Sequence, residues 1–176
     1  MSYTISKLIP EDELREGIKK VAERINNDYG DKDVHLVCVL KGGVYFLTEL
    51  SKYLKMNVSI DFMSVSSYGS STVSSGVVKI IKDLDEPIKD KNVIVVEDIV
   101  DTGNTLSYLI SMLKDREPAS IKLCTMLDKP SRREKDIDAD YTAFTIPDKF
   151  VLGFGLDFDQ KYRNLPYIGV VEFDEQ

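Results

Sequence analysis

The stretch that decides the fold is Val93-Ile94-Val95-Val96-Glu97-Asp98-Ile99-Val100-Asp101-Thr102-Gly103-Asn104-Thr105-Leu106, in a chain of 176 residues. It begins with a short run of apolar, β-branched residues, which is typical of a strand covered on both faces of a parallel sheet. The residues that follow, 106–114, have the pattern of a helix. The sequence therefore predicts a buried strand that turns directly into a helix.

The turn between this strand and helix has the residues of a phosphate-binding site. The first backbone N–H groups of a helix have no partner within it, and the helix dipole places partial positive charge at the same end. Gly103 lets the backbone approach an anion closely, and the hydroxyls of Thr102 and Thr105 can donate to phosphate oxygens. We expect a phosphate group to be held at this helix start.

Three acids stand beside the turn: Glu97, Asp98 and Asp101. They would repel a phosphate unless a cation or a hydroxyl-rich sugar lay between, and a sugar phosphate bound to Mg²⁺ meets both conditions. An ordinary capped turn from strand to helix is the alternative, because Asp, Thr, Gly and Asn are common there. Of the residues in this stretch, Glu97 and Asp98 are the ones that an ordinary turn explains least well.

The run of four apolar residues, Glu97-Asp98, two apolar residues and Asp-Thr-Gly-x-Thr closely resembles the 5-phosphoribosyl-1-pyrophosphate (PRPP) signature of type I phosphoribosyltransferases. The resemblance implies an α/β fold with a mostly parallel twisted sheet, flanking helices and a small hood subdomain. The length of the chain suits a single domain over residues 1–176. Within it, the resemblance implies a flexible active-site loop at 66–76 and a purine-binding hood at about 149–176.

The composition limits the kinds of function. A net charge of −7 argues against a general nucleic-acid-binding surface, and the single histidine, His35, is too little for triads or multi-histidine metal sites. Cys38 and Cys124 sit in apolar runs, so we expect buried, reduced thiols. No window has the roughly 18 apolar residues that span a bilayer, and no leader pattern opens the chain. We expect a cytoplasmic protein without nucleic-acid or membrane partners.

A second strand-to-helix unit comes earlier in the chain. Residues 34–40 have the pattern of a buried strand and residues 45–54 that of a helix. The carboxyl ends of parallel strands lie at the same edge of a sheet, which would bring Lys41 toward Glu97 and Asp101. The alternative is a surface lysine that precedes a glycine turn. The segment resembles the pyrophosphate-binding loop of 6-oxopurine phosphoribosyltransferases, which implies that Lys41 and Gly42 bind substrate and that the peptide after Leu40 can be cis.

Residues 66–76 are rich in serine and lie between two segments, 58–65 and 77–81, that alternate like paired strands. We expect a mobile, hairpin-like excursion, and a solvated loop without function is the alternative. Tyr68 stands out because a tyrosine is costly to leave exposed among serines. Ser67 and Tyr68 belong to a segment that resembles the family's active-site lid, which folds over the reacting groups.

Lys129 follows a further apolar strand, residues 119–127, and lies in a run of charges. Such a run is by default a solvated face. The position resembles that of the family lysine that contacts the purine 6-oxo group. A cationic donor there would favour oxopurines over 6-aminopurines, because adenine offers a donor at that position.

Residues 149–168 resemble the family's purine-binding hood. The resemblance implies that Phe150 stacks on the base and that the backbone near Val151 reads its edge. It also implies that Asp157 holds a second Mg²⁺ and that Arg163 reaches pyrophosphate. From the residues alone, three phenylalanines of this segment are predicted to lie in the core: Phe150, Phe154 and Phe158.

Together these motifs resemble those of the bacterial-type hypoxanthine-guanine phosphoribosyltransferases. The resemblance implies Mg²⁺-dependent transfer of 5-phosphoribosyl from PRPP to N9 of hypoxanthine or guanine, giving IMP or GMP and pyrophosphate. Residues 102–105 would hold the 5′-phosphate, Glu97 and Asp98 would bind the ribose directly or through Mg²⁺, and Asp101 would be the general base. Some relatives have a lysine at the position of Asn104, so phosphate binding here would rest on the backbone and the Asn104 amide.

Two other functions stay open. An enzyme that prefers xanthine, or xanthine and guanine, would share nearly every motif. A regulator that senses PRPP and binds RNA or DNA would keep the fold, although the acidic charge of the chain disfavours it. Family relatives are dimers or tetramers, so we expect a homodimer or homotetramer.

Overall fold

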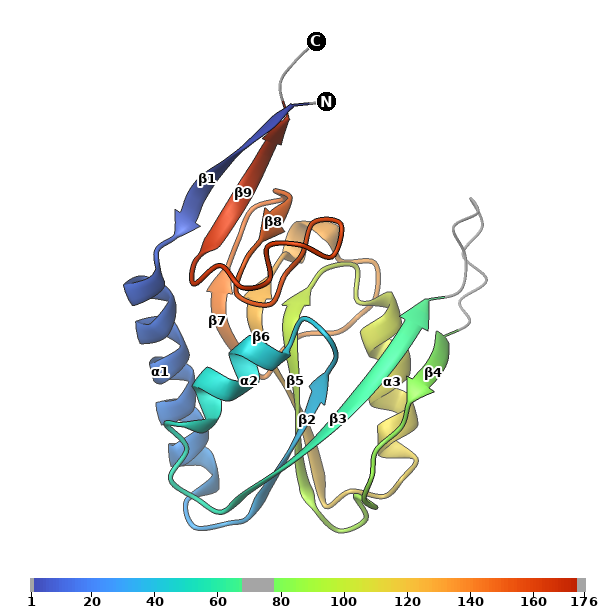
Figure 1. Cartoon of the computed structure of the whole chain (residues 1–176). Helices are drawn as coiled ribbons and strands as arrows, with labels where there is room; N and C mark the ends of the chain where they lie inside the picture. The colour runs from blue at the N-terminus through green and yellow to red at the C-terminus, as the bar shows by residue number, and fades with distance from the viewer. Residues whose placement is uncertain (1, 68–77, 174–176) are drawn as a thin grey trace.

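A six-stranded sheet forms the centre of the computed structural model, which describes residues 2–67 and 78–173 (Figure 1). The sheet is parallel except at its edge strand β4, which runs antiparallel to β3. In spatial order its strands are β4 (Val78–Lys82), β3 (Val58–Ser67), β2 (Val34–Val39), β5 (Asn92–Val100), β6 (Ser120–Asp128) and β7 (Tyr141–Thr145). The predicted mostly parallel sheet is confirmed.

A second, smaller sheet stands over the carboxyl ends of the central strands (Figure 1). Its strands pair antiparallel, and in spatial order they are β1 (Tyr3–Ile9), β9 (Ile168–Phe173) and β8 (Val151–Leu152). Two of its strands, β8 and β9, come from residues 149–176, the segment predicted to form a purine-binding hood, and the small sheet with its loops is called the hood below. It includes the N-terminal strand β1, which the sequence analysis did not assign to it.

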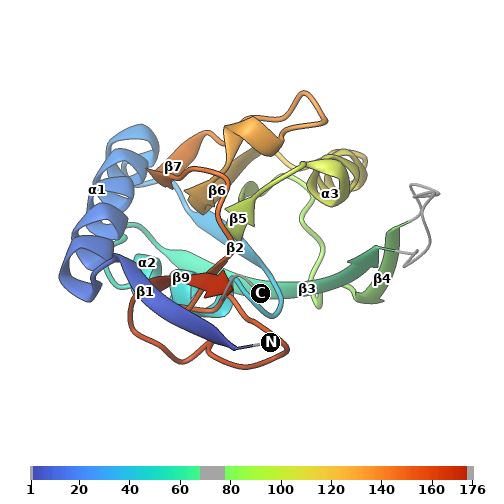
Figure 2. The same ribbon diagram turned by 90° about the horizontal axis from the view of Figure 1, so that it is seen from above.

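Helices cover both faces of the central sheet (Figure 2). They are α1 (Glu11–Tyr29), α2 (Val44–Ser51), α3 (Asn104–Lys114) and the short 3₁₀ helix η1 (Pro130–Arg132). Alternate residues of β5 divide between two cores, with Ile94 and Val96 packed on the side of α1 and α2, and Val93 and Val95 on the side of α3. This double burial explains why the run is apolar without alternation. Among the described residues, no helix is both long and apolar enough to cross a membrane.

The two cysteines lie in the core, as predicted. Cys38 in β2 and Cys124 in β6 are buried and free. Burial, with a smaller contribution from Glu97 and Asp98, raises the pKa of Cys38 to about 12, and burial also raises the pKa of Cys124. Both thiols therefore stay protonated at neutral pH and are poor nucleophiles.

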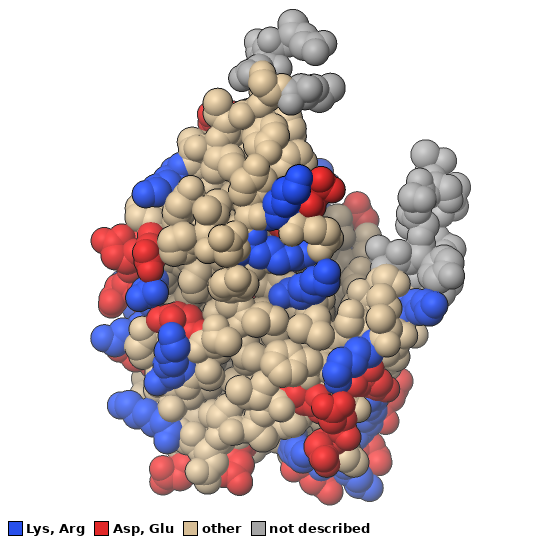
Figure 3. All heavy atoms as spheres, viewed as in Figure 1, with Lys and Arg blue, Asp and Glu red and all other residues tan. Residues whose placement is uncertain are grey.

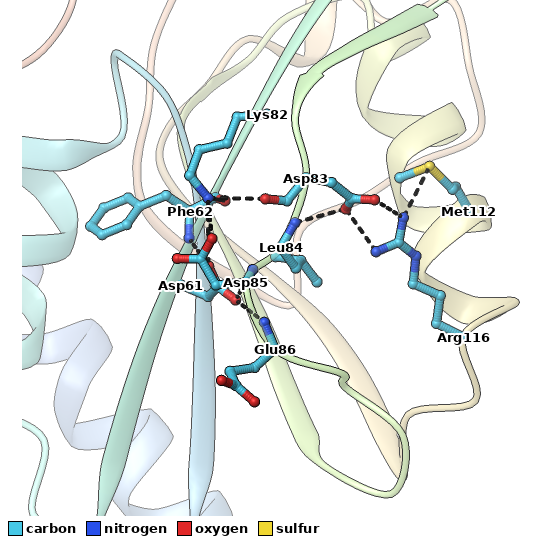
Figure 4. Close-up of polar contacts among 9 residues, drawn as sticks. All are labelled: Asp61, Phe62, Lys82, Asp83, Leu84, Asp85, Glu86, Met112 and Arg116. Atoms are coloured by element: carbon cyan, nitrogen blue, oxygen red, sulfur yellow. Dashed lines mark hydrogen bonds and ion pairs between the residues drawn. The ribbon is translucent and has the colours of Figure 1, made fainter.

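Asp61 ties β3 to the segment that leads into β5 (Figure 4). Its buried carboxylate accepts hydrogen bonds from the backbone N–H groups of Phe62 at 2.7 Å, Asp85 at 2.9 Å and Glu86 at 3.2 Å. Burial by itself raises the pKa of Asp61, but these donors and the Lys82 ammonium outweigh it and leave the pKa below its usual value. The ionised carboxylate therefore stabilises the folded chain.

Asp83 in the same segment fixes the far end of α3 (Figure 4). Arg116 donates to both of its carboxylate oxygens, with Nη1 to Oδ1 at 2.7 Å and Nη2 to Oδ2 at 2.8 Å. A bidentate pair of this kind restricts orientation as well as distance. The helix whose first turn faces the candidate site is therefore held at its other end by an ion pair.

We predict that Asp61→Asn lowers the free energy of unfolding at pH 7 by about 2 kcal/mol, because an amide cannot accept from all three backbone donors. A depressed pKa means that the stabilisation is present above the unfolded pKa, about 3.9, and is lost as pH falls through the folded pKa. The difference between the parent and the variant should therefore shrink below about pH 4. Denaturant unfolding at neutral and acid pH measures both effects.

The matched control is Asp85→Asn. The Asp85 side chain is 77% exposed, and its carboxylate also lies near Lys82. We expect a loss of less than about 0.5 kcal/mol there, because exposed ion pairs contribute little. Equal losses in the two variants would contradict the assignment.

Candidate active site

The loop between β5 and α3 borders a cavity of about 190 Å³, lined by residue 97 and residues 99–106. Gly103, the residue before α3, has a φ of 82°. This left-handed conformation favours glycine, and a side chain there would also collide with Ile137. The first turn of α3 therefore opens onto the cavity, in the arrangement of a phosphate-binding helix start.

The segment after β6 closes the other side of this loop. The backbone N–H groups of Glu134 and Lys135 donate to the Thr102 carbonyl at 2.9 and 3.2 Å. The Asn104 amide donates to Glu134 Oε2 at 2.6 Å. Asn104 thus uses its side chain to fasten this segment to the start of α3, a contact that the sequence analysis did not foresee.

Asp101 has a fixed backbone and an accessible carboxylate. Arg133 Nη1 donates to the Asp101 carbonyl at 2.6 Å, and Arg133 also pairs with Asp128 at the end of β6. The Asp101 side chain is 42% exposed, with Arg132 Nε at 3.3 Å from its Oδ1. A carboxylate held in this way can exchange a proton with a ligand.

Lys129 is connected to Asp101 through two further charges. Its ammonium lies 3.7 Å from Asp148 Oδ1, and Arg132 Nη1 lies 3.8 Å from Asp148 Oδ2. Its backbone N–H donates to the carbonyl of Val100 at 2.9 Å, next to Asp101. Lys129 is also buried, unlike a lysine on a solvated face. The structure therefore brings Asp101 and Lys129 into one group.

Glu97 and Asp98 lie partly buried near the end of β5. The backbone N–H of Asp98 donates to Glu97 Oε1 at 3.1 Å, and that of Ile99 donates to Asp98 Oδ1 at 2.7 Å. Burial, and then the neighbouring charge of Asp98, raises the pKa of Glu97; burial raises the pKa of Asp98 as well. Ionising both carboxylates is therefore costly unless a cation lies beside them.

This pair of acids fits a divalent ion only together with other oxygens. Within residues 2–67 and 78–173, no group of three or more His, Cys, Asp or Glu side chains is arranged to hold a metal. Mg²⁺ in proteins commonly takes one or two carboxylates and completes its shell with water and substrate phosphates. Glu97 and Asp98 match that donor set.

The loop after β2 is packed between these acids and the hood. The peptide bond between Leu40 and Lys41 is cis, a form that the resemblance allows at this position. A side chain at position 42 would overlap the Asp98 carboxylate. On its other side, Gly155 of the hood has a φ of 100° and lies so close to the Gly42 carbonyl that a side chain there would overlap it. The predicted pyrophosphate loop therefore touches both the acids and the hood.

Lys41 and Arg163 meet in the same region, where Figure 3 shows Lys and Arg side chains gathered over the hood loops and the loop after β2. Arg163 Nη1 donates to the Gly155 carbonyl at 2.7 Å, and Nη2 lies 3.2 Å from Asp157 Oδ1. Both Lys41 Nζ and Arg163 Nη2 donate to Gln160 Oε1, at 3.2 and 3.1 Å. Gln160 carries no motif signal and was missed from the sequence.

The aromatic side chains of the hood differ in how far they are buried. Phe154 is buried, so its predicted core position is confirmed, whereas Phe150 is 48% exposed and the same prediction is wrong for it. The rings of Phe150 and Phe158 pack edge to face with 5.5 Å between their centres. The ring of Tyr3 in β1 packs on Phe158 in the same way, with 5.2 Å between the centres. The side chain of Val151 in β8 is buried, so a ligand could contact this residue only through its backbone.

The predicted lid begins at the end of β3. Ser66 and Ser67 pair with Lys79 and Val78 of β4. Tyr68 and the rest of the predicted loop lie outside the described residues, so the lid stays a prediction.

Known proteins resemble this chain over nearly its whole length. Residues 10–159 match the family profile of the phosphoribosyl transferase domain. The chain is 49% identical over 165 residues to the hypoxanthine-guanine phosphoribosyltransferase of Streptococcus thermophilus, covering 94% of this chain and 92% of that protein. It is 47% identical over 173 residues to the Bacillus subtilis protein of the same name, covering 98% and 96%. The crystal structure of a hypoxanthine-guanine phosphoribosyltransferase from Bacillus anthracis matches with a TM-score of 0.90 at 45% identity, covering 94% of this chain and 97% of that one.

We predict that Gly155→Ala lowers the free energy of unfolding by about 3 kcal/mol, because it adds left-handed strain and forces the hood away from Gly42. Gly30→Ala is the control: Gly30 has a φ of 58°, and a side chain there would meet nothing within 4 Å. The control should lose only the strain, about 1 to 2 kcal/mol. Thermal or denaturant unfolding compares them, and equal losses would argue against a tight contact between the hood and Gly42.

Proposed function

Because the chain belongs to the phosphoribosyltransferase family of enzymes, we propose that it transfers the 5-phosphoribosyl group of PRPP to N9 of hypoxanthine or guanine. The products are IMP or GMP and pyrophosphate, so the reaction salvages a purine base. The proposal is carried by the chain of charges from Asp101 through Arg132 and Asp148 to Lys129, because it sets a candidate base and a candidate oxopurine donor beside one phosphate loop. The names of the similar proteins support the same reaction.

PRPP would lie along the carboxyl ends of β5 and β2. Residues 102–105 hold its 5′-phosphate through the N–H groups at the start of α3 and the threonine hydroxyls. Glu97 and Asp98 accept hydrogen bonds from the ribose hydroxyls or hold the metal beside them. The pyrophosphate group is bound by three residues: Lys41, Gly42 and Arg163.

Mg²⁺ is the proposed cofactor. Glu97 and Asp98 would hold it together with oxygens of the ribose and the pyrophosphate, and Asp157 would hold a second ion once its pair with Arg163 opens. When bound, the ion neutralises charge on the leaving pyrophosphate. Glu97, whose pKa is raised first by burial and then by the charge of Asp98, would ionise at lower cost with a cation beside it.

The purine would lie between the hood and the segment after β6. Phe150 stacks on its face, and the backbone near Val151 reads its edge. Lys129 donates to the 6-oxo oxygen, which favours oxopurines over adenine. Asp101 accepts the proton from N7 as N9 forms the new bond to the ribose.

The remaining parts of the proposal concern the exclusion of water from the site, the cellular location and the oligomeric state. Ser67 and Tyr68 belong to a lid that covers the site, since the ribose carbon becomes cation-like as pyrophosphate leaves and water would capture it. The protein works in the cytoplasm as a homodimer or homotetramer, without nucleic-acid or membrane partners. Its net charge of −7 supports the absence of a nucleic-acid partner.

We predict that Asp101→Asn lowers kcat by about 10²- to 10⁴-fold, because an amide cannot accept the N7 proton. The KM for PRPP should stay within about threefold of the parent value, since the proton transfer occurs only in the transition state. Absorbance of IMP in a mixture of PRPP, Mg²⁺ and hypoxanthine measures both constants. Asp138→Asn, at an exposed carboxylate of the segment after β6, should leave them unchanged.

Two results would count against these assignments. A parent protein that forms no IMP or GMP would refute the proposed function. A kcat for Asp101→Asn within a few-fold of the parent value would refute only the role of Asp101.

We predict that Lys129→Met lowers kcat/KM for hypoxanthine and guanine by about 10- to 100-fold, because one charged hydrogen bond to the 6-oxo group is lost. The exposed Lys149→Met is the control and should keep the parent values. Competition between hypoxanthine, guanine and xanthine for limiting PRPP then gives the preference among the oxopurines. If xanthine outcompetes hypoxanthine, the xanthine-preferring alternative is correct.

A further inference from the structure

The side-chain oxygen of Gln160 is shared by the two cations of the proposed pyrophosphate site. Lys41 Nζ donates to Gln160 Oε1 at 3.2 Å, and Arg163 Nη2 donates to the same atom at 3.1 Å. Both contacts lie at the exposed surface, where a ligand can reach them. One neutral oxygen therefore holds together two positive groups that would otherwise repel each other.

The backbone at Gln160 is unfavourable for this residue type. Phe158 and Lys161 exchange both backbone hydrogen bonds, so Asp159 and Gln160 are the central residues of a two-residue hairpin turn. Their φ values are 52° and 62°. Turns with two positive φ values favour Asn-Gly or Asp-Gly, so glycine is the residue that the backbone at position 160 prefers. A glutamine in this conformation points to a role for its side chain.

The turn is also held in place against the cations. The backbone N–H of Gln160 donates to Asp157 Oδ2 at 2.9 Å, while Asp157 Oδ1 lies 3.2 Å from Arg163 Nη2. Asp157 thus fixes both the turn and the guanidinium. Gln160 then reaches from the turn to Lys41, which lies 119 positions away in the sequence.

The charge of the bridging group matters because pyrophosphate is an anion. A carboxylate at this position would form ion pairs with Lys41 and Arg163 and repel an incoming phosphate oxygen. A neutral carbonyl oxygen holds the same two donors without cancelling their charge. It also leaves them already converged, which lowers the entropy cost of binding.

We propose that Gln160 is a positioning residue for pyrophosphate: its neutral oxygen keeps Lys41 and Arg163 converged in the free protein, and an oxygen of pyrophosphate or of the PRPP pyrophosphoryl group takes over both donors on binding. This inference rests on the proposed function. It adds a residue that acts through the two cations and explains why an amide stands in a turn that favours glycine.

Two substitutions test the proposal in the full chain, with direct calorimetric binding of pyrophosphate in Mg²⁺ and in EDTA. Gln160→Gly suits the turn, so thermal stability should stay equal or rise, while the Kd for pyrophosphate should increase by about threefold or more because the cations lose their shared acceptor. Gln160→Glu should increase the Kd by about tenfold or more, because a carboxylate competes with the ligand. The KM for PRPP should follow the same order, with kcat and the KM for hypoxanthine within about threefold of the parent values.

Asn164→Asp is the matched control, because it adds one carboxylate at an exposed position of the same hood loop. The proposal is overturned if Gln160→Glu weakens pyrophosphate binding by less than about threefold, if Gln160→Gly binds pyrophosphate as tightly as the parent or more tightly, or if the control weakens it as much as Gln160→Glu. Calorimetry needs no turnover, so a failure of the inference is distinguishable from a parent protein that makes no nucleotide.

Discussion

Contact between two glycine backbones holds this site together. Gly155 of the hood lies against the carbonyl of Gly42, and Gly42 lies against the Asp98 carboxylate, each too close to admit a side chain. The Gly155 N–H also donates to the Arg163 carbonyl at 2.9 Å, and the Gly155 carbonyl accepts from the Arg163 guanidinium. The acids of β5, the loop after β2 and the cations of the hood therefore share one set of backbone contacts, and none of them can shift without the others.

This packing also couples the charges of the site. Burial raises the pKa of Asp98, and the charge of Arg163 acts in the opposite direction. Arg163 is in turn balanced by Asp157 at 3.2 Å. In a chain whose net charge is −7, two cations of the site thus lie beside the paired acids Glu97 and Asp98. The proposed complex of pyrophosphate with Mg²⁺ would need this arrangement of charges.

The parts that the sequence predicted well are those fixed by neighbours along the chain. The apolar run from Val93, the turn at Gly103 and the helix after it follow from periodicity and turn chemistry, and the structure has them within a few residues. Partners far apart in the sequence left no such signal. Arg132 belongs to the run of charges that was by default a solvated face, and Asp148 carried no signal in the sequence. Their contacts with Lys129 and Asp101 depend on how β6 and the hood are placed. Whether an aromatic ring such as Phe150 is buried likewise depends on which elements pack against it.

The pairing of β1 with β9 has a consequence for the connectivity of the molecule. Tyr3 lies opposite Phe173 in that ladder, and Figure 1 shows the start of β1 beside the end of β9. The first and last strands of the described structure are therefore neighbours in space. A circular permutant, with the start of β1 joined to the end of β9 by a short linker and new ends opened in an exposed turn distant from the hood, would preserve every strand pairing described above.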